Sequence, residues 1–215
     1  MNIDSVPKEW SSAFDSITDF VSLHDKEFRI VRANKALSDF VGLKPEELIG
    51  KHCHEIFHST LVPHADCPHA EAMKLKDTVI REFHESKFGL DISVVASPVF
   101  DGKGDLQGTI HFVRNITERK KEESFVKRNA EILEMIATGE PVSDIYDAIA
   151  LMYEARHPGM RCSLLELKGN KLMHGGAPSL PKEYCDAVDG LENGPSVGSC
   201  GTSTYTGKAV YVEDI

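Results

Sequence analysis

The sequence has 215 residues, of which 41% are hydrophobic and 27% are charged, and its formal net charge is −10. This length allows two modest domains with packed cores, while the acidic balance excludes a general surface for nucleic acids or anionic membranes, which clustered Lys and Arg would provide. The N-terminal residues lack a signal-peptide pattern, and the apolar runs are shorter than the roughly 20 residues of a membrane helix. We therefore expect a cytoplasmic protein without nucleic-acid or membrane partners, whose five cysteines are mostly reduced.

Short strand and helix patterns alternate at the start of the chain. Two strand-like runs flank the polar turn 25–27 and predict a hairpin. Further on, Pro45 followed by two carboxylates is typical of a helix start, and Gly50 ends that helix. The expected elements are strands over 20–24 and 28–31, helices over 33–40 and 45–50, and a helix over 69–75.

Three longer runs at 79–85, 90–100 and 106–115 are rich in β-branched and aromatic residues. The turn 101–105, Asp-Gly-Lys-Gly-Asp, joins the last two as an antiparallel pair. Together with the hairpin, these runs predict an α+β fold with a five-stranded antiparallel sheet. The helical insert after the second strand covers one face of this sheet and leaves a pocket there.

A cluster of Cys and His residues lies in this insert. Thiolates and imidazoles are the donors that Zn²⁺ or Fe prefers, and the best four-ligand set is Cys53, His58, His64 and Cys67, in which the last two form a short clip. The alternative is a structural role, with Cys53 as a small buried residue and the histidines on loop surface. The cluster comprises His52, Cys53, His54, His58, His64, Cys67 and His69.

Three stretches carry a family resemblance. They are 28–36 (Phe-Arg-Ile-Val-Arg-Ala-Asn-Lys-Ala), 42–51 (Gly-Leu-Lys-Pro-Glu-Glu-Leu-Ile-Gly-Lys) and 113–120 (Val-Arg-Asn-Ile-Thr-Glu-Arg-Lys). With the order of the elements, they resemble a PAS sensor domain, which we expect over 10–117. The closing motif of that family reads Asp-Ile-Thr, and Asn115 stands here in place of the Asp. The usual salt bridge to the outgoing helix would then be replaced by neutral hydrogen bonds.

The resemblance also bears on cofactors. Related PAS domains often read Cys-x4-His-x5-Cys-x2-Cys-Pro in the insert, so His64 resembles a ligand-conserving replacement, which favours a Zn or Fe site. Haem-binding members use a His on the long helix that faces the sheet, and His69 lies near that place. A haem held by His69 is therefore an alternative. The segment 50–53 resembles the start of a flavin-photosensor motif, but the residues around Cys53 do not match the rest of it, which disfavours a flavin.

The rest of the chain predicts a linker and a second unit. Residues 118–136 have apolar positions at three- and four-residue spacing, typical of a helix that is either a solvated connector or a dimerising signal helix. The second unit covers 137–215. Its expected elements are helices over 143–154 and 181–188, strands over 161–167, 171–177 and 209–215, and a Gly-rich loop over 194–207.

That loop and its flanks, Leu191-Glu192 and 210–215, are similar to GAF domains of bacterial sensors, especially those upstream of diguanylate cyclase or histidine kinase modules. A GAF sheet has about six strands, so the resemblance implies the N-terminal half of such a domain, a partial α/β sheet. We expect a half-sheet to be poorly ordered or completed by a second chain in a homodimer. Cys200 lies in a Gly-Ser-Cys-Gly stretch that suits a tight turn better than a reactive thiol.

Motifs for catalysis are missing. The sequence contains no phosphate-binding loop, no nucleophile elbow and no kinase histidine followed by an ATPase domain. We therefore expect no enzyme and no catalytic residues. The expected function is sensory input to a bacterial signal-transduction protein, in two-component or cyclic-di-GMP signalling, with a small ligand, metal or redox signal relayed through the helix to the GAF half and an output domain. The alternative is a dimerisation module without a small-molecule signal.

Overall fold

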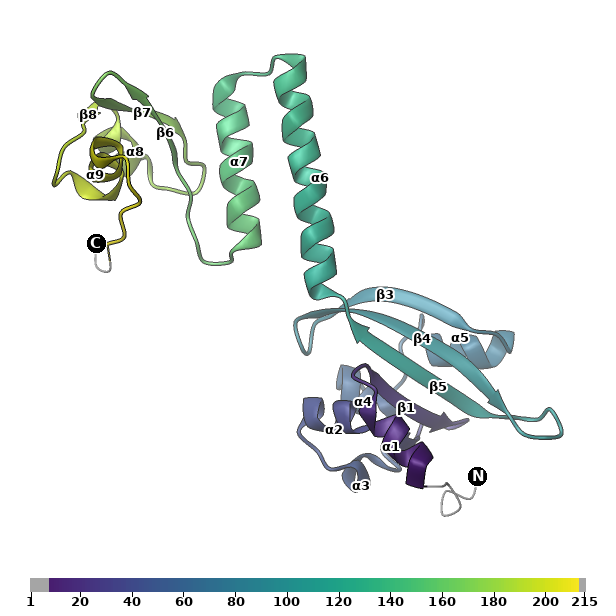
Figure 1. The fold of residues 1–215 in the computed structure, drawn as a ribbon. Helices are drawn as coiled ribbons and strands as arrows, with labels where there is room; N and C mark the ends of the chain where they lie inside the picture. Colours follow the sequence, from purple (N-terminus) through teal and green to yellow (C-terminus); the bar gives the residue numbers. More distant parts are fainter. Residues whose placement is uncertain (1–7, 213–215) are drawn as a thin grey trace. The chain divides into compact units, whose positions relative to one another are not determined.

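The computed structural model describes residues 8–212, and the chain divides into two units that meet between Lys120 and Lys121. The first unit carries a larger sheet with short helices, and the second carries helices and a smaller sheet (Figure 1). Both sheets and the mixed α and β content agree with the predicted fold class. The domain limits expected from the sequence, 10–117, 118–136 and 137–215, stay predictions.

The first unit contains, among the described residues, the predicted five-stranded antiparallel sheet, in the order β2-β1-β5-β4-β3. Figure 1 labels β1, β5, β4 and β3 of this sheet. The turn between β4 and β5 is held by Asp101, whose Oδ1 accepts hydrogen bonds from the N–H groups of Lys103 and Asp105. Asp in this place suits a turn because its side chain can bond the backbone two residues on. The strands are β1 (Phe20–Asp25), β2 (Ile30–Ala33), β3 (Val79–Glu85), β4 (Leu90–Phe100) and β5 (Leu106–Asn115).

Asn34 joins the helical insert to the sheet. Its Oδ1 accepts hydrogen bonds from the N–H groups of Leu37, as an N-cap, and of Val21 in β1. Its Nδ2 donates to the carbonyls of Ile17 and Asp19, so this fully buried side chain has all its polar groups satisfied. The helices of this unit are α1 (Lys8–Ser16), α2 (Lys35–Val41), α3 (Pro45–Leu48), α4 (Cys53–His58) and α5 (Pro68–Leu75).

The inner face of the sheet is covered by α5, which packs across β3, β4 and β5. On that face Ala72 of α5 contacts Val79 and Ala96. A second apolar cluster lies under α2, α3 and α4, and its fully buried members contribute roughly 1.5–3 kcal/mol each to folding. The buried residues of this second cluster are Ile30, Ala33, Leu37, Leu48, Cys53 and Phe57.

The second unit begins within α6, which starts at Thr117 and ends at Thr138. Ile132 of α6 packs on Ile145 and Met152 of the following helix, and Arg156 lies 4.6 Å over the Phe125 ring. Within residues 8–212, no helix combines the length and apolar character needed to cross a bilayer. The remaining elements are α7 (Val142–Arg156), β6 (Leu164–Lys168), β7 (Lys171–Gly176), α8 (Lys182–Val188), β8 (Leu191–Glu192) and α9 (Gly198–Thr206).

Two expectations for the second unit are wrong. The Gly-rich stretch is not a loop, because α9 forms within it and places Cys200 in a helix rather than a turn. The third strand is β8, which pairs with β7, whereas 209–212 form no strand and 213–215 lie outside the described residues. Composition misled both predictions. Gly, Ser and Thr have low helix propensity, and tertiary packing can override it, while the β-branched and aromatic residues of 209–212 favour a strand that does not form.

Candidate functional site

The four predicted metal ligands line one small cavity on the inner side of the sheet. Cys53 and His58 come from α4, Cys67 precedes α5, and His64 lies on the loop between them. The cavity measures about 40 Å³, and the rings of His58 and His64 have their centroids 4.9 Å apart. Among the described residues, no three of the four bring ligand atoms within 4.8 Å of one another. A metal held by this set stays a prediction.

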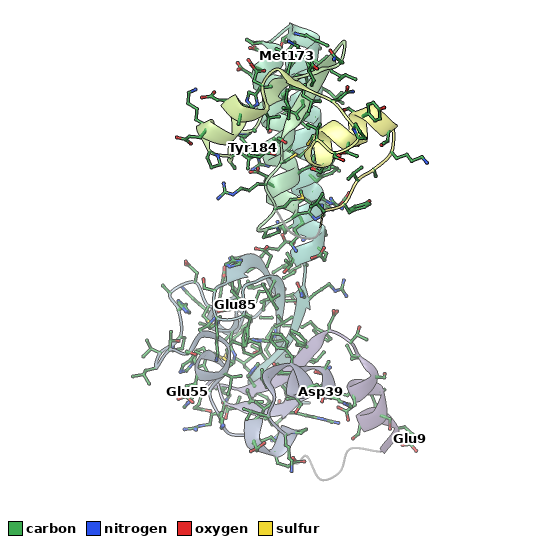
Figure 2. The ribbon with its side chains drawn as sticks, turned by 90° about the vertical axis from the view of Figure 1, so that its left-hand side faces the viewer. Glu9, Asp39, Glu55, Glu85, Met173 and Tyr184 are labelled. Atoms are coloured by element: carbon green, nitrogen blue, oxygen red, sulfur yellow. The ribbon has the colours of Figure 1, made fainter. Side chains whose placement is uncertain are left out.

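His58 has a partner typical of a metal-binding histidine. Its Nδ1 lies in hydrogen-bonding contact with Oε2 of Glu85, a buried carboxylate at the end of β3. Glu85 is labelled in Figure 2. Such a carboxylate fixes the ring and leaves Nε2 directed elsewhere. Burial lowers the pKa of His58, although the charge of Glu85 acts in the opposite direction.

Cys53 has features of both roles predicted from the sequence, a metal ligand and a small buried residue. It lies in the apolar cluster under the short helices, and it also lines the cavity with Cys67. Burial raises the pKa of its thiol to about 12, with a smaller contribution from Cys67. Without a metal, Cys53 is therefore a protonated and poorly nucleophilic thiol at neutral pH.

We expect Cys53 to be the slowest of the five cysteines to react with N-ethylmaleimide in the folded, metal-free protein. The thiolate is the reactive form, and a pKa of about 12 leaves very little of it at neutral pH. Peptide mass spectrometry after timed labelling measures the rate at each cysteine, with Cys67, which is only half-buried, as the matched control. Labelling of Cys53 as fast as Cys67 would contradict the buried position.

A second group of histidines lies deeper on the inner face. His24 of β1, His69 of α5 and His111 of β5 form a three-histidine cluster whose ligand nitrogens all lie within 4.8 Å of one another. The ring centroids of His24 and His111 are 4.2 Å apart. The ring centroid of His69 lies 5.3 Å from that of His24 and 5.2 Å from that of His111. Phe28 stacks on His69 with centroids 4.3 Å apart.

The strand pairing explains this arrangement. His24 lies opposite Thr109 of β5, and Ser22 lies opposite His111. Because side chains alternate along a strand, His24 and His111 are diagonal neighbours on the same face. The N-terminal turn of α5 then places His69 over them, where Nδ1 of His69 lies 3.2 Å from Oγ1 of Thr109.

These histidines are buried without hydrogen-bond partners at several nitrogens, namely both nitrogens of His24, Nε2 of His69 and Nε2 of His111. Burial is the main cause that lowers all three pKa values. The pKa of His69 falls to about 4 and that of His111 to about 3, and the pKa of His24 lies well below its usual range. Asp25 partly offsets the effect at His69. The imidazoles are therefore neutral at physiological pH.

Sequence reasoning found His69 but not His24 or His111. Alternation along 106–115 puts His111 on the same face as the apolar Val113, which could have indicated an inward histidine. It could not indicate that His24 lies beside it, because this depends on the register between β1 and β5. A haem held by His69 stays a prediction.

A larger groove adjoins the small cavity and shares His58, His64 and Cys67 with it. Its volume is about 780 Å³, and it lies between the loop 59–67 and β3. One wall is held by Arg81 of β3, whose guanidinium lies 2.6 Å from both carboxylate oxygens of Glu71 on α5. The groove has the size of a site for a small organic ligand.

The family model for the PAS fold matches residues 14–121, just over half of the chain. The chain belongs to the PAS family. The match ends in the first turn of α6, so the PAS domain includes the cavity, the groove and the three-histidine cluster.

Relatives of the PAS domain include sensors. The chain is 31% identical over 115 residues to the methyl sulfide methyltransferase-associated sensor of Methanosarcina acetivorans, which covers 53% of the chain but only 12% of that protein. The solved structure of a PAS domain from Colwellia psychrerythraea is 20% identical to the chain, with a TM-score of 0.40. The match covers 52% of the present chain and 97% of the Colwellia chain. The PAS domain of BvgS from Bordetella pertussis is also 20% identical with a TM-score of 0.40, over 58% and 96%.

Proposed function

We propose that the PAS domain is a sensory input module whose signal enters the groove and cavity of the helical insert and acts on α6 through β3. The observation that carries this proposal is the position of β3. Its residues 81–85 line the groove, and one of them, Glu82, also pairs with the first turn of α6. A PAS domain with a sensor as its relative supports the same function.

The contacts at the start of α6 provide a mechanical link. Glu82 is the direct neighbour of Phe83 on β3, so a shift of Phe83 in the groove wall also displaces Glu82. Glu82 accepts from Arg119 at 2.6 Å and from Lys120 at 2.8 Å. The pKa of Glu82 is lowered, first by its hydrogen bond with Lys120. Ligand-dependent displacement of β3 would therefore change these pairs.

Neutral hydrogen bonds add to this link, as Asn115 in the closing motif predicts. Oδ1 of Asn115 accepts from the N–H of Thr117 at 3.0 Å. Oγ1 of Thr117 in turn accepts from the N–H of Asp91 at 3.0 Å and ties α6 to β4. The ion pairs of Glu82 stand beside these bonds, so the missing Asp of the motif does not leave the helix start without charged contacts.

We expect Phe83→Ala to speed hydrogen exchange of the amides at 117–121 roughly five-fold, because loss of the groove wall loosens β3. Ile80→Ala is the matched control, since Ile80 lies on the same strand but outside the groove and is 58% exposed. In a Glu82→Gln background the effect of Phe83→Ala on these amides should fall. Equal effects of Phe83→Ala and Ile80→Ala would contradict the proposed route.

A second candidate function is self-association through the outer face of the sheet. The strand register places Ile80, Val95 and Phe112 in one row across β3, β4 and β5, and Phe112 and Ile80 are exposed. An exposed apolar row of this kind is typical of an interaction surface. The same variants test it, because Ile80→Ala, and not Phe83→Ala, would then change the sedimentation of the chain.

The proposal extends to the full signalling protein. The signal would pass along α6 into the GAF-like unit, and from there to an output domain of the cyclase, phosphodiesterase or histidine kinase type outside this chain, as the resemblance implies. Zn or Fe at Cys53, His58, His64 and Cys67 is one form the signal could take. The expectations of a homodimer, of a cytoplasmic location and of no nucleic-acid partner stay predictions.

A further inference from the structure

We propose that His24, His69 and His111 bind one divalent transition-metal ion, with Zn²⁺ as the reference ion, at a site separate from the Cys-containing set. The inference deepens the proposed function, because its signalling role rests on the PAS domain being a sensor. The binding site itself rests only on the three-histidine cluster.

The geometry of the cluster is that of a nearly formed ligand set. Two ligands come from neighbouring strands whose register is fixed by the sheet, and the third comes from the first turn of α5. A tetrahedral Zn²⁺ with Zn–N bonds of about 2.0–2.1 Å would hold its nitrogens roughly 3.3 Å apart. The ligand nitrogens lie within 4.8 Å of one another, so small side-chain rotations complete the site.

The burial of unpartnered histidine nitrogens favours a bound metal ion. A buried polar group without a hydrogen-bond partner destabilises the fold, because it has lost its contacts with water and gained none in the protein. Four nitrogens of the cluster are in this condition, on side chains that are 7% exposed or less. An ion shared by the three rings would satisfy one nitrogen of each ring at once. Apolar residues at these positions would fill the same space without that destabilisation, so three inward histidines in contact indicate a ligand.

The protonation state also suits a metal. Imidazole binds a metal in its neutral form, and burial keeps these three rings neutral at physiological pH. Thr109 supplies the outer contact that metal-bound histidines usually have. When Nδ1 of His69 donates to Oγ1 of Thr109, the lone pair of Nε2 is free to bind. Phe28 then holds the ring plane by stacking.

Three neutral ligands leave one coordination position open and the charge of the ion uncompensated. His111 lines the small cavity as well as the cluster, and that cavity has room for a water or a small anion. We therefore place the fourth ligand, a water, hydroxide or small anion, in the cavity. A sensor built in this way would respond to the ion itself or to the small ligand that replaces the water.

The first test is metal binding by the full chain. The metal-stripped Cys53→Ser, Cys67→Ser double variant, which lacks the Cys-containing set, is titrated with Zn²⁺ against a chromophoric chelator. The expected result is one tight site per chain that is lost when His24→Phe or His111→Phe is added. Phe is close in size and removes unpartnered nitrogens, so these variants should fold at least as well as the parent without metal. His84→Phe, at an exposed histidine of β3, is the matched control and should bind normally.

The second measurement separates this site from the Cys-containing set. Co²⁺ bound by three imidazoles gives visible ligand-field bands without the near-ultraviolet charge-transfer band of a cobalt thiolate. We expect this spectrum in the Cys53→Ser, Cys67→Ser double variant, and we expect it to disappear when His111→Phe is added. The dissociation constant should rise by 10- to 100-fold in Thr109→Val, as for other outer-shell partners, and by more in the histidine variants.

Failure of the Cys53→Ser, Cys67→Ser double variant to bind Zn²⁺, or stoichiometric Zn²⁺ binding by this variant that survives the addition of His24→Phe and His111→Phe, would overturn the three-histidine site. No binding by the folded parent would overturn it as well, while the Phe83→Ala experiment would still test the sensory function. Zn²⁺ binding that requires the histidines supports the site. If it leaves exchange at 117–121 unchanged, the metal is structural and its signalling role is wrong.

Discussion

Replacing Gly108 by Ala is expected to lower the free energy of unfolding of the PAS domain by about 3 kcal/mol or more. Gly108 lies in β5 directly opposite Asp25, at a φ of +155°. A Cβ built there would lie 1.8 Å from the carbonyl oxygen of His24. Backbone atoms cannot move aside as a flexible side chain can, so β1 and β5 must separate or shift.

Native-state hydrogen exchange of the β1 and β5 amides in the full chain measures this loss. Gly102→Ala is the matched control, because Gly102 lies in the nearby β4–β5 turn, where an added Cβ meets nothing within 4 Å and φ is not positive. We expect the control to stay within about 0.5 kcal/mol of the parent. A Gly108→Ala variant as stable as the control would show that the strands pair less closely than described.

The sheet could be predicted from the sequence because its signals are local. The strands 79–85, 90–100 and 106–115 are found at their predicted limits, since β-branched runs are bounded by Gly and Asp turns. The helix starts at Pro45 and Pro68 follow from the fixed φ of proline.

The site could be predicted only in part, because only some of its residues lie close together in the sequence. The residues of the four-ligand set lie within fifteen positions, and the structure brings them around one cavity. His24 and His111 are separated by almost ninety positions, and only the pairing of β1 with β5 makes them neighbours. Periodicity shows which face a residue occupies but not the register between distant strands. The Cys and His residues that lie close together in the sequence were therefore predicted as a site. The three histidines, which lie closer together in space but far apart in the sequence, were not.

Lowering the pH from 7 to 5 should destabilise the metal-free PAS domain by about 2 kcal/mol for each of His69 and His111, and His24 should add to this loss. In the unfolded chain these residues titrate near 6.5, whereas the folded pKa is about 4 for His69 and about 3 for His111, and well below 6.5 for His24. The unfolded state therefore binds more protons below pH 6.5. The stability is fully present above that pH and is lost as the pH falls towards the folded pKa values.

Denaturant unfolding in the presence of a chelator, at pH 7 and pH 5, measures this difference. His111→Phe should reduce the pH-dependent loss by about 2 kcal/mol, because the ring whose folded pKa is about 3 is gone. His84→Phe removes an exposed histidine and should leave the loss unchanged. Carboxyl groups ordinarily titrate mostly below this window, and Asp25, the charged group that acts on His69, is the same in the parent and in the variants. A loss of the same size in the parent and in His111→Phe would contradict the assignment, because it would place the acid-sensitive groups outside the cluster.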